Sequence, residues 1–170
     1  MRVESEQLRA FADDLMNSAP VIQKLINKST IRIAVILEAH IKEKAPQFQG
    51  NLVNSIRGRA KVQGRAHAAV VSSSVAYAKV QDEGRRPGKM PPHDPIRRWV
   101  ELKLFKRAGI AADGMDQSID SITYLIRRAI GRKGTKATKY ITRGIRAATP
   151  QIEAELKRLG EEIRRYLEDE

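Results

Sequence analysis

The chain of 170 residues contains no cysteine, only three histidines and few aromatic side chains, which make up 5% of it. The absence of cysteine excludes a disulfide framework, thiolate catalysis and cysteine-based metal sites. The scarcity of aromatics argues against base stacking as a way of binding nucleic acid. No apolar run approaches the length of a membrane-spanning helix, so we expect no membrane association. The first fifteen residues are charged and lack a continuous apolar run, so we also expect no signal peptide.

The residues that usually carry catalysis are not grouped in this sequence. His40 lies in a helical stretch of aliphatic residues, His67 lies in the middle of a predicted strand, and His93 is followed by Asp94 without a second set of ligands. A metal or acid–base site needs several such groups to converge. We therefore expect no metal, no cofactor and no enzymatic activity.

Charge is abundant and mostly positive, with 32 basic and 20 acidic residues and a formal net charge of +12. Residues 57–107 contain 13 basic and 4 acidic residues, and residues 127–146 contain eight basic residues and no acid. Such clustering indicates that a polyanion or an acidic protein surface lies nearby in the working assembly. A generally basic surface without a specific partner is the plain alternative.

Three basic groups are candidates for contact with DNA phosphates or another polyanion. They are Arg57, Arg59, Lys61 and Arg65 on a predicted hairpin, Arg85, Arg86 and Lys89 on a loop, and Arg132, Lys133, Lys136 and Lys139 after a predicted helix. Contacts of this kind are sequence-blind and depend steeply on salt. The run Gly131–Lys136 lacks the spacing of a phosphate-binding loop, so we interpret it as a helix end with solvated charges.

Hydrophobic periodicity predicts two helices in the first part of the chain, over residues 4–17 and 20–43. Pro20 separates them, because proline is disfavoured inside a helix but accepted in a first turn. The second helix should stop before Pro46. A short helical turn is expected around residues 52–56.

The next segment alternates in the manner of β-strands. Residues 57–62 and 65–71 are predicted to form an antiparallel hairpin with its turn at Gln63–Gly64. The alternation places three cations, Arg57, Arg59 and Lys61, on one face of the first strand. Ser72–Ser74 is expected to be a break or a polar edge, and residues 75–83 a strand end followed by a helical turn.

The second half of the chain is predicted to be helical. Asp94 is the expected N-cap of a helix with Pro95 at its first position. Further helices are expected over 116–130, 137–147 and 150–168, and residues 109–114 form a predicted loop. The sequence leaves open whether the chain bends or runs straight at Pro150. The fold class is therefore α+β: a long N-terminal helix, a small antiparallel sheet and a helical C-terminal half. We expect one domain over residues 1–147, extended by an amphipathic helix over 148–170.

Two features are candidate interaction surfaces. The first is a loop over residues 84–94 that is too rich in proline and glycine for regular structure, and it should order against a partner unless it is simply mobile. Its candidate contact residues are Gly84, Arg85, Arg86, Pro87, Lys89, Met90, Pro91 and Pro92. The second is the aliphatic seam of the last helix, which packs either on its own domain or on a neighbouring subunit. The seam consists of Ile152, Leu156, Leu159, Ile163 and Leu167.

Several short motifs follow one another along the chain. They are Ala45-Pro46, Gly50 with Leu52, Ser55-Ile56, Tyr77 with Ala78, Glu83-Gly84, the proline-rich loop and Trp99. In this order and spacing they resemble the small neck and tail-completion proteins of long-tailed bacteriophages, the family that includes minor tail protein Z. The resemblance covers roughly residues 20–160.

The resemblance implies a structural virion protein. Such a protein would be assembled in the host cytoplasm and would form a homo-oligomeric ring of six or twelve subunits at the neck. Its partners would be the tail terminator or tube and the head-connector proteins, and its basic residues would line a channel for packaged DNA. Two alternatives stay open: a sequence-non-specific basic nucleic-acid-binding protein unrelated to virions, and a small nuclease, against which the missing catalytic set counts.

Overall fold

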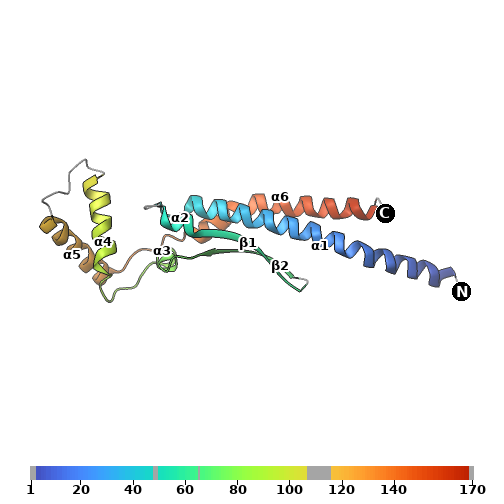
Figure 1. Ribbon diagram of the computed structural model, residues 1–170, viewed down its shortest axis with the longest axis horizontal. Coiled ribbons are helices and arrows are strands. Elements are labelled where there is room, and N and C mark those ends of the chain that lie inside the picture. Colours follow the sequence, from blue (N-terminus) through green and yellow to red (C-terminus); the bar gives the residue numbers. More distant parts are fainter. Residues whose placement is uncertain (1–2, 48–49, 65, 107–115, 169–170) are drawn as a thin grey trace. The chain divides into compact units, whose positions relative to one another are not determined.

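The computed structural model describes the backbone of residues 3–47, 50–64, 66–106 and 116–168, with the side chains of all of these except 3–18 and 104–106. The predicted loop at 109–114 and Arg65 lie outside the described residues. The fold is α+β, as predicted, with a long N-terminal helix, one antiparallel hairpin and a helical C-terminal half (Figure 1). The chain divides into a first unit, Met1–Ala78 with Lys139–Glu170, and a second unit, Lys79–Thr138.

The first unit contains two long helices and the hairpin. Its elements are α1 (Val3–Lys44), α2 (Asn51–Ser55), β1 (Ile56–Gln63), β2 (Ala66–Ser73) and α6 (Tyr140–Glu168). The helical turn expected around residues 52–56 is present as α2, and α1 stops before Pro46 as expected. The boundary that we placed at residue 147 lies inside α6.

Helix α1 is continuous, so the predicted break at Pro20 is wrong. A proline inside a helix removes one backbone hydrogen bond and costs about 3 kcal/mol. Pro20 is exposed, so water can hydrate the carbonyl group that lost its donor. Packing of α1 against α6 and the hairpin supplies the stability that outweighs this cost.

Helix α6 is also continuous and contains Pro150, so the helical segments predicted over 137–147 and 150–168 form one helix, which answers the question left open at Pro150. The start of α6 at Tyr140 has a local cause. Thr138 donates from its backbone N and its Oγ1 to the carbonyl of Gln81, at 3.2 and 2.6 Å. Lys139 then takes a left-handed φ of 50°, and the helix begins only after it.

The two long helices pack through small side chains. Gly144 is buried in α6, and a Cβ added there would lie 2.6 Å from the Cα of Ile41 in α1. Ala148, one turn later, has no exposed surface. Farther along, the buried Glu155 carboxylate accepts hydrogen bonds from Arg32 of α1 at 3.4 Å and from Arg158 at 2.8 Å. The close approach of the helices therefore depends on the absence of a side chain at residue 144.

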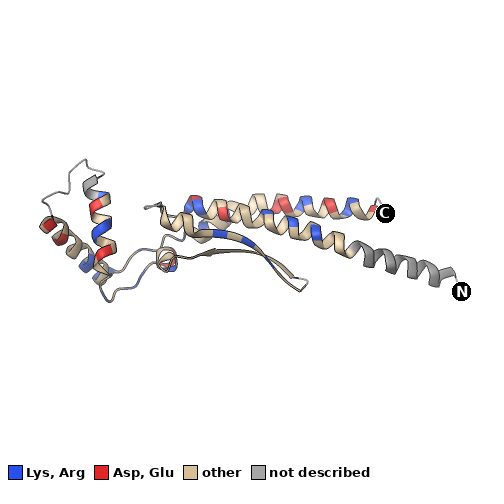
Figure 2. Cartoon of the chain, in the orientation of Figure 1, with Lys and Arg blue, Asp and Glu red and all other residues tan. Residues whose placement is uncertain are grey.

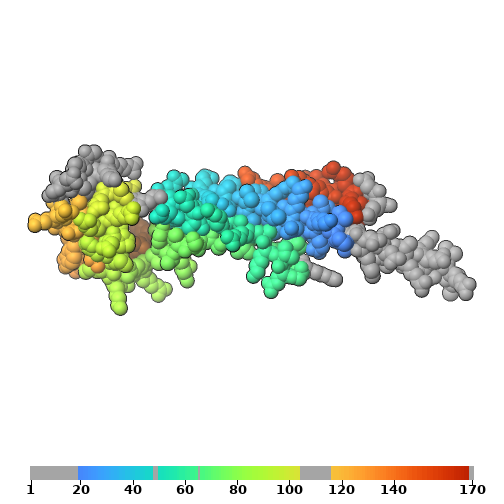
Figure 3. Space-filling model, viewed as in Figure 1, coloured from blue at the N-terminus to red at the C-terminus, as the bar shows by residue number. Residues whose placement is uncertain are grey.

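The hairpin also packs against α1, and the space-filling view shows the two in direct contact (Figure 3). Its register runs from Ile56 opposite Ser73 to Gln63 opposite Ala66, with Gly64 in the turn at a φ of 60°. Ser72 and Ser73 belong to the ladder, so the break expected at Ser72–Ser74 begins only at Ser74. A Cβ on Gly58 would lie 2.2 Å from the carbonyl oxygen of Ala34, which explains why β1 carries a glycine there.

The second unit contains shorter helices around a smaller apolar cluster. Its elements are α3 (Ala78–Glu83, from Lys79 on), α4 (His93–Val100), the π-helical turn η1 (Glu101–Lys106) and α5 (Asp116–Lys133). Val100 and Ile119 are fully buried, and four partly buried side chains pack on them: Ile96, Trp99, Ile122 and Ile126. The cluster joins α4 to α5.

The start of α4 differs from the prediction. The helix begins at His93 after Pro92, not after an Asp94 cap, and Pro92 has φ −54° and ψ 149° with no side-chain cap. Two prolines close together fix extended backbone immediately before His93, which leaves the first turn to start there. Asp94 lies in that first turn, where a negative charge still interacts favourably with the helix dipole.

Candidate functional site

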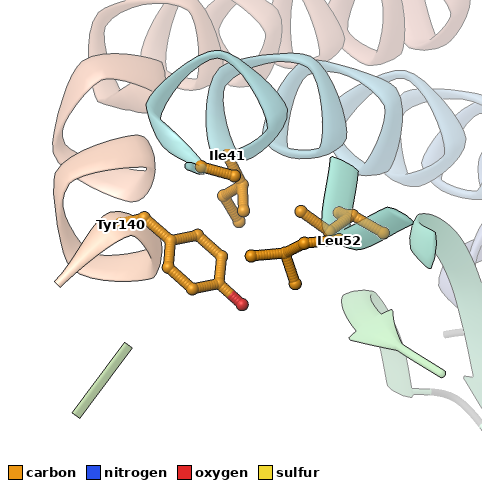
Figure 4. Packing of buried hydrophobic residues seen from close by; sticks show 5 residues of the cluster. Ile41, Leu52 and Tyr140 are labelled. Atoms are coloured by element: carbon orange, nitrogen blue, oxygen red, sulfur yellow. The ribbon is translucent and has the colours of Figure 1, made fainter. Parts of the chain in front are cut away.

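The residues of the sequence motif form the core of the first unit. Ala45, Leu52 and Ile56 are buried in one cluster with Ile41 and Tyr140 (Figure 4). Tyr140 comes from the distant α6 and is 1% exposed. The motif around residues 45–56 therefore closes the junction between α1, the hairpin and α6. The contact of Tyr140 with this motif could not be predicted, because no local pattern indicates it.

Other motif residues determine the path of the backbone. Gly50 has a left-handed φ of 72° just before α2, a conformation that glycine adopts without strain. Ser55 Oγ donates to the carbonyl of Leu52 at 2.7 Å, which ties the end of α2. Glu83 ends α3, and Gly84 follows at a φ of 78°, as expected for the start of the loop. Tyr77 is 46% exposed and takes no part in the core.

The proline-rich loop is ordered against its own chain, contrary to the expectation that it needs a partner. Arg85 and Thr135 form a two-way backbone bridge with N–O distances of 3.0 and 2.9 Å. Gly88 N donates to the carbonyl of Gly131 at 2.8 Å, and Arg127 Nε donates to the carbonyl of Pro91 at 2.8 Å. These bonds arise because α5 ends at Lys133 and Gly134 turns the chain alongside the loop at a φ of 72°.

The exposed side chains of this loop remain candidates for contact with another molecule. Arg86, Pro87, Lys89 and Met90 are exposed, and Met90 is 43% exposed. The side chain of Arg85 is turned inward, since its Nη2 donates to the carbonyl of Lys89 at 2.5 Å. The loop thus presents two cations and one large apolar side chain from a backbone that is already held in place.

The predicted cationic face of the hairpin is present. Arg57, Arg59 and Lys61 are exposed, whereas the intervening Gly58 and Ala60 are half-buried toward α1. The cations lie opposite neutral residues of β2, namely Ser72, Val70 and Ala68. Positive residues are visible along β1 in Figure 2. Arg65, predicted to extend this group, lies outside the described residues.

The third basic group is only partly brought together. Arg132 and Lys133 occupy the last turn of α5, where positive charge is favoured by the helix dipole. Lys136 follows in the exposed connection, and all three belong to the second unit. Lys139 belongs to the first unit and lies just before α6. The interpretation of this run as a helix end with solvated charges is confirmed at Gly134, whose N bonds to the carbonyl of Ile130 at 2.8 Å.

A polar hollow of about 350 Å³ lies where α2 meets the hairpin. Its lining residues, which we call the serine–arginine hollow, are Asn54, Ser55, Arg57, Arg59 and Ser72–Ser74. The sequence indicated the two arginines but not the hollow, because Ser72–Ser74 could be interpreted only as a strand break or a polar edge. The register of β2 places Ser72 directly opposite Arg57.

Within the described residues, no group of three or more His, Cys, Asp or Glu side chains is placed to hold a metal ion. His93 lies 3.2 Å from Asp94 and 3.6 Å from Asp120. Asp120 also accepts from Arg97 at 2.9 Å, and this hydrogen bond raises the pKa of Arg97 above its ordinary value. Asp120 is thus engaged by Arg97, and this ion pair links α4 to α5.

Helix α6 presents a second surface beside the one that packs on α1. Its exposed aliphatic side chains, which are 38–50% exposed, are Ile141, Ile145, Leu156 and Leu167. Of the seam predicted over residues 152–167, Leu156 and Leu167 are exposed, whereas Ile152, Leu159 and Ile163 are half-buried. The fully buried residues of α6 are Tyr140, Gly144, Ala148 and Glu155.

Two further findings bear on identity. Over the residues that the structure describes, no helix has the length and apolar character needed to cross a bilayer. No protein-family model, curated protein or solved structure matches the chain.

Proposed function

We propose that the protein is a structural virion protein, one subunit of a homo-oligomeric ring at the head–tail neck of a long-tailed bacteriophage. The ring would complete the tail and join it to the DNA-filled head, with basic residues facing DNA or acidic partners. The observation that carries the proposal is that the motif residues Ala45, Leu52 and Ile56 pack as one buried cluster. These residues determine backbone conformation and core packing, as expected of a structural protein that functions through contacts at its surface.

The surfaces that remain exposed are consistent with ring assembly. A cyclic ring needs two different faces of each subunit to meet. The first unit offers an aliphatic surface on α6, with Leu156 50% exposed, and a cationic surface on β1. The second unit offers the exposed part of the loop around Met90. We propose these surfaces as contacts with neighbouring subunits and with the tail and head-connector proteins, and we propose no enzymatic role.

The experiment that tests the proposal is electron microscopy of particles assembled with and without this protein. Tail-less heads accompanied by free, complete tails are expected in its absence, because the joining step alone would fail. Normal infectious particles in its absence would overturn the neck assignment.

A sequence-non-specific nucleic-acid-binding protein is the second candidate, favoured by the exposed row of Arg57, Arg59 and Lys61. Binding through phosphates alone would be steeply salt-dependent. Tight duplex binding by the free subunit at low salt, lost by about 200 mM salt, would favour this candidate. Weak binding by the free subunit together with the joining defect would favour the ring.

A further inference from the structure

We propose that the serine–arginine hollow is a binding site for a phosphate group. The first unit builds it from the end of α2 and one end of the hairpin, with two guanidinium groups and several hydroxyl groups on its wall. Guanidinium and hydroxyl donors are the groups that bind phosphate oxygens in proteins. The inference does not depend on ring formation, since every lining residue belongs to one chain and one unit.

Three backbone carbonyl groups that neighbour the lining residues in the sequence are already hydrogen-bonded. The carbonyl of Leu52 accepts from Ser55 Oγ at 2.7 Å, and the carbonyl of Val53 accepts from the backbone N of Ile56. The carbonyl of Ile56 accepts from Arg57 Nη1 at 2.8 Å. These three oxygens therefore already have donors within the protein.

A chain of hydrogen bonds fixes the floor of the hollow. Ser55 Oγ lies 2.7 Å from Ser73 Oγ, and because Ser55 gives its proton to Leu52, Ser73 must be the donor of this pair. The backbone N of Val75 in turn donates to Ser73 Oγ at 3.4 Å. This network holds β2 at the end of α2 and leaves the neighbouring hydroxyl groups free to bind.

Those neighbouring groups lack partners within the described part of the chain. The side chains of Arg59, Ser72 and Ser74 make no hydrogen bond or ion pair to any described residue, and all three residues are exposed at the hollow. Glu38 of α1 lines no part of the hollow, and its carboxylate accepts from Gly58 N at 2.6 Å and pairs with Lys42. Positive charge and hydroxyl donors thus converge without a carboxylate among the lining residues.

A phosphate group fits these features better than a carboxylate. Phosphate offers more acceptor oxygens and more charge, so it can engage the two arginines and two serines together. Its source can be the backbone of a nucleic acid or a small phosphorylated compound. The volume of about 350 Å³ and the open mouth leave room for the ester groups of either.

The test compares two variants that remove one positive charge each from the same exposed row. Arg59→Gln changes the hollow, whereas Lys61→Gln lies two residues along β1 and lines no part of it. Binding of inorganic phosphate is followed by NMR titration of the backbone amides of Ser72–Ser74 at constant ionic strength. Binding of a DNA duplex is followed by fluorescence anisotropy at low salt.

We expect saturable phosphate shifts in the wild-type chain, weakened about tenfold by Arg59→Gln and no more than about threefold by Lys61→Gln. Ser72→Ala, which keeps the charge, should also weaken binding several-fold. A greater loss of duplex affinity in Arg59→Gln than in Lys61→Gln would identify nucleic acid as the source of the phosphate. Equal duplex affinities with saturable phosphate binding would identify a small phosphorylated compound.

Three results would overturn the proposal. The first is phosphate shifts that grow without saturating, and the second is equal weakening by the two charge variants. The third is a glutamate-rich peptide that binds at the same amides with the same dependence on Arg59, which would make the surface an acidic-protein contact. Circular dichroism of each variant checks folding, which should be unaffected because both cations are exposed.

Discussion

Each of the two units is stabilised internally in a different way. In the first unit, long helices and a hairpin meet through buried side chains and through glycines that leave no room for one, such as Gly58 and Gly144. In the second unit, a small apolar cluster is supplemented by backbone bonds between the loop and the end of α5. Stability in the first unit should depend on side-chain volume, and in the second on backbone conformation. Four substitutions test this difference between the units.

The largest effect is expected for Tyr140→Ala, which empties the core of the first unit. Removing a fully buried aromatic ring typically costs about 3–5 kcal/mol. Urea denaturation should show this loss, and hydrogen exchange should report it in α1 and the hairpin, with α5 much less affected. Tyr124→Ala is the control, because Tyr124 is 49% exposed on α5 and should cost little. Equal losses for the two would contradict the core assignment.

The next effect is expected for Gly144→Ala. The added methyl group would lie 2.6 Å from the Cα of Ile41, so the helices must separate at a cost of about 2 kcal/mol. Gly160→Ala is a matched control in the same helix, with nothing within 4 Å of the added Cβ. It should stabilise the chain by about 0.5–1 kcal/mol through helix propensity. Thermal unfolding that ranks both variants alike would disprove the close helix contact.

In the second unit, Gly134→Ala should release the loop. The residue has a φ of 72°, and its Cβ would lie 1.9 Å from the carbonyl oxygen of Arg85. Gly64→Ala shares the positive φ of 60° but meets nothing within 4 Å, so it measures the conformational cost alone, about 1 kcal/mol. Faster exchange of the Gly88 and Thr135 amides in the first variant, without change in α1, is the expected result. Unchanged protection of these two amides would argue against the bridge.

The smallest effect concerns the stability of the fold at acid pH. The hydrogen bond from Gly58 N, aided by Lys42, lowers the pKa of Glu38 below its ordinary value of 4.5. A carboxylate with a lowered folded-state pKa stabilises the fold above its unfolded-state pKa, and this contribution is lost as the pH falls through the folded-state value.

Glu38→Gln should therefore cost about 1 kcal/mol at neutral pH and flatten the decline of stability below pH 4.5. Glu43→Gln is the comparison, since the side chain of Glu43 is 61% exposed and should contribute little. Denaturant midpoints measured between neutral and acid pH distinguish the two. Parallel pH curves for wild type and Glu38→Gln would show that this carboxylate does not anchor the hairpin to α1.

Local features of the fold could be predicted from the sequence, whereas long-range ones could not. The alternation around Arg57 and Arg59 gave the hairpin and its cationic face, and Gly84 gave the end of α3. The helix break predicted at Pro20 is wrong, and the sequence left the course of the chain at Pro150 open, because tertiary packing outweighs the local cost of a proline.

The candidate surfaces also differ in whether local sequence or long-range pairing determines them. The exposed cations on β1 follow from period-two alternation, which is a local property. The pairing of Arg85 with Thr135 depends on two segments 50 residues apart, and no local pattern indicates it. The serine–arginine hollow likewise requires the register that brings Ser72 opposite Arg57.

The most direct test of the proposed neck role is a cryo-electron microscopy reconstruction of the neck in intact particles that contain this protein. A closed ring of six or twelve copies is predicted between head and tail, with density that fits the paired helices α1 and α6 and the hairpin of the first unit. A neck whose density is fully explained by other chains, with this protein elsewhere or missing, would contradict the proposal.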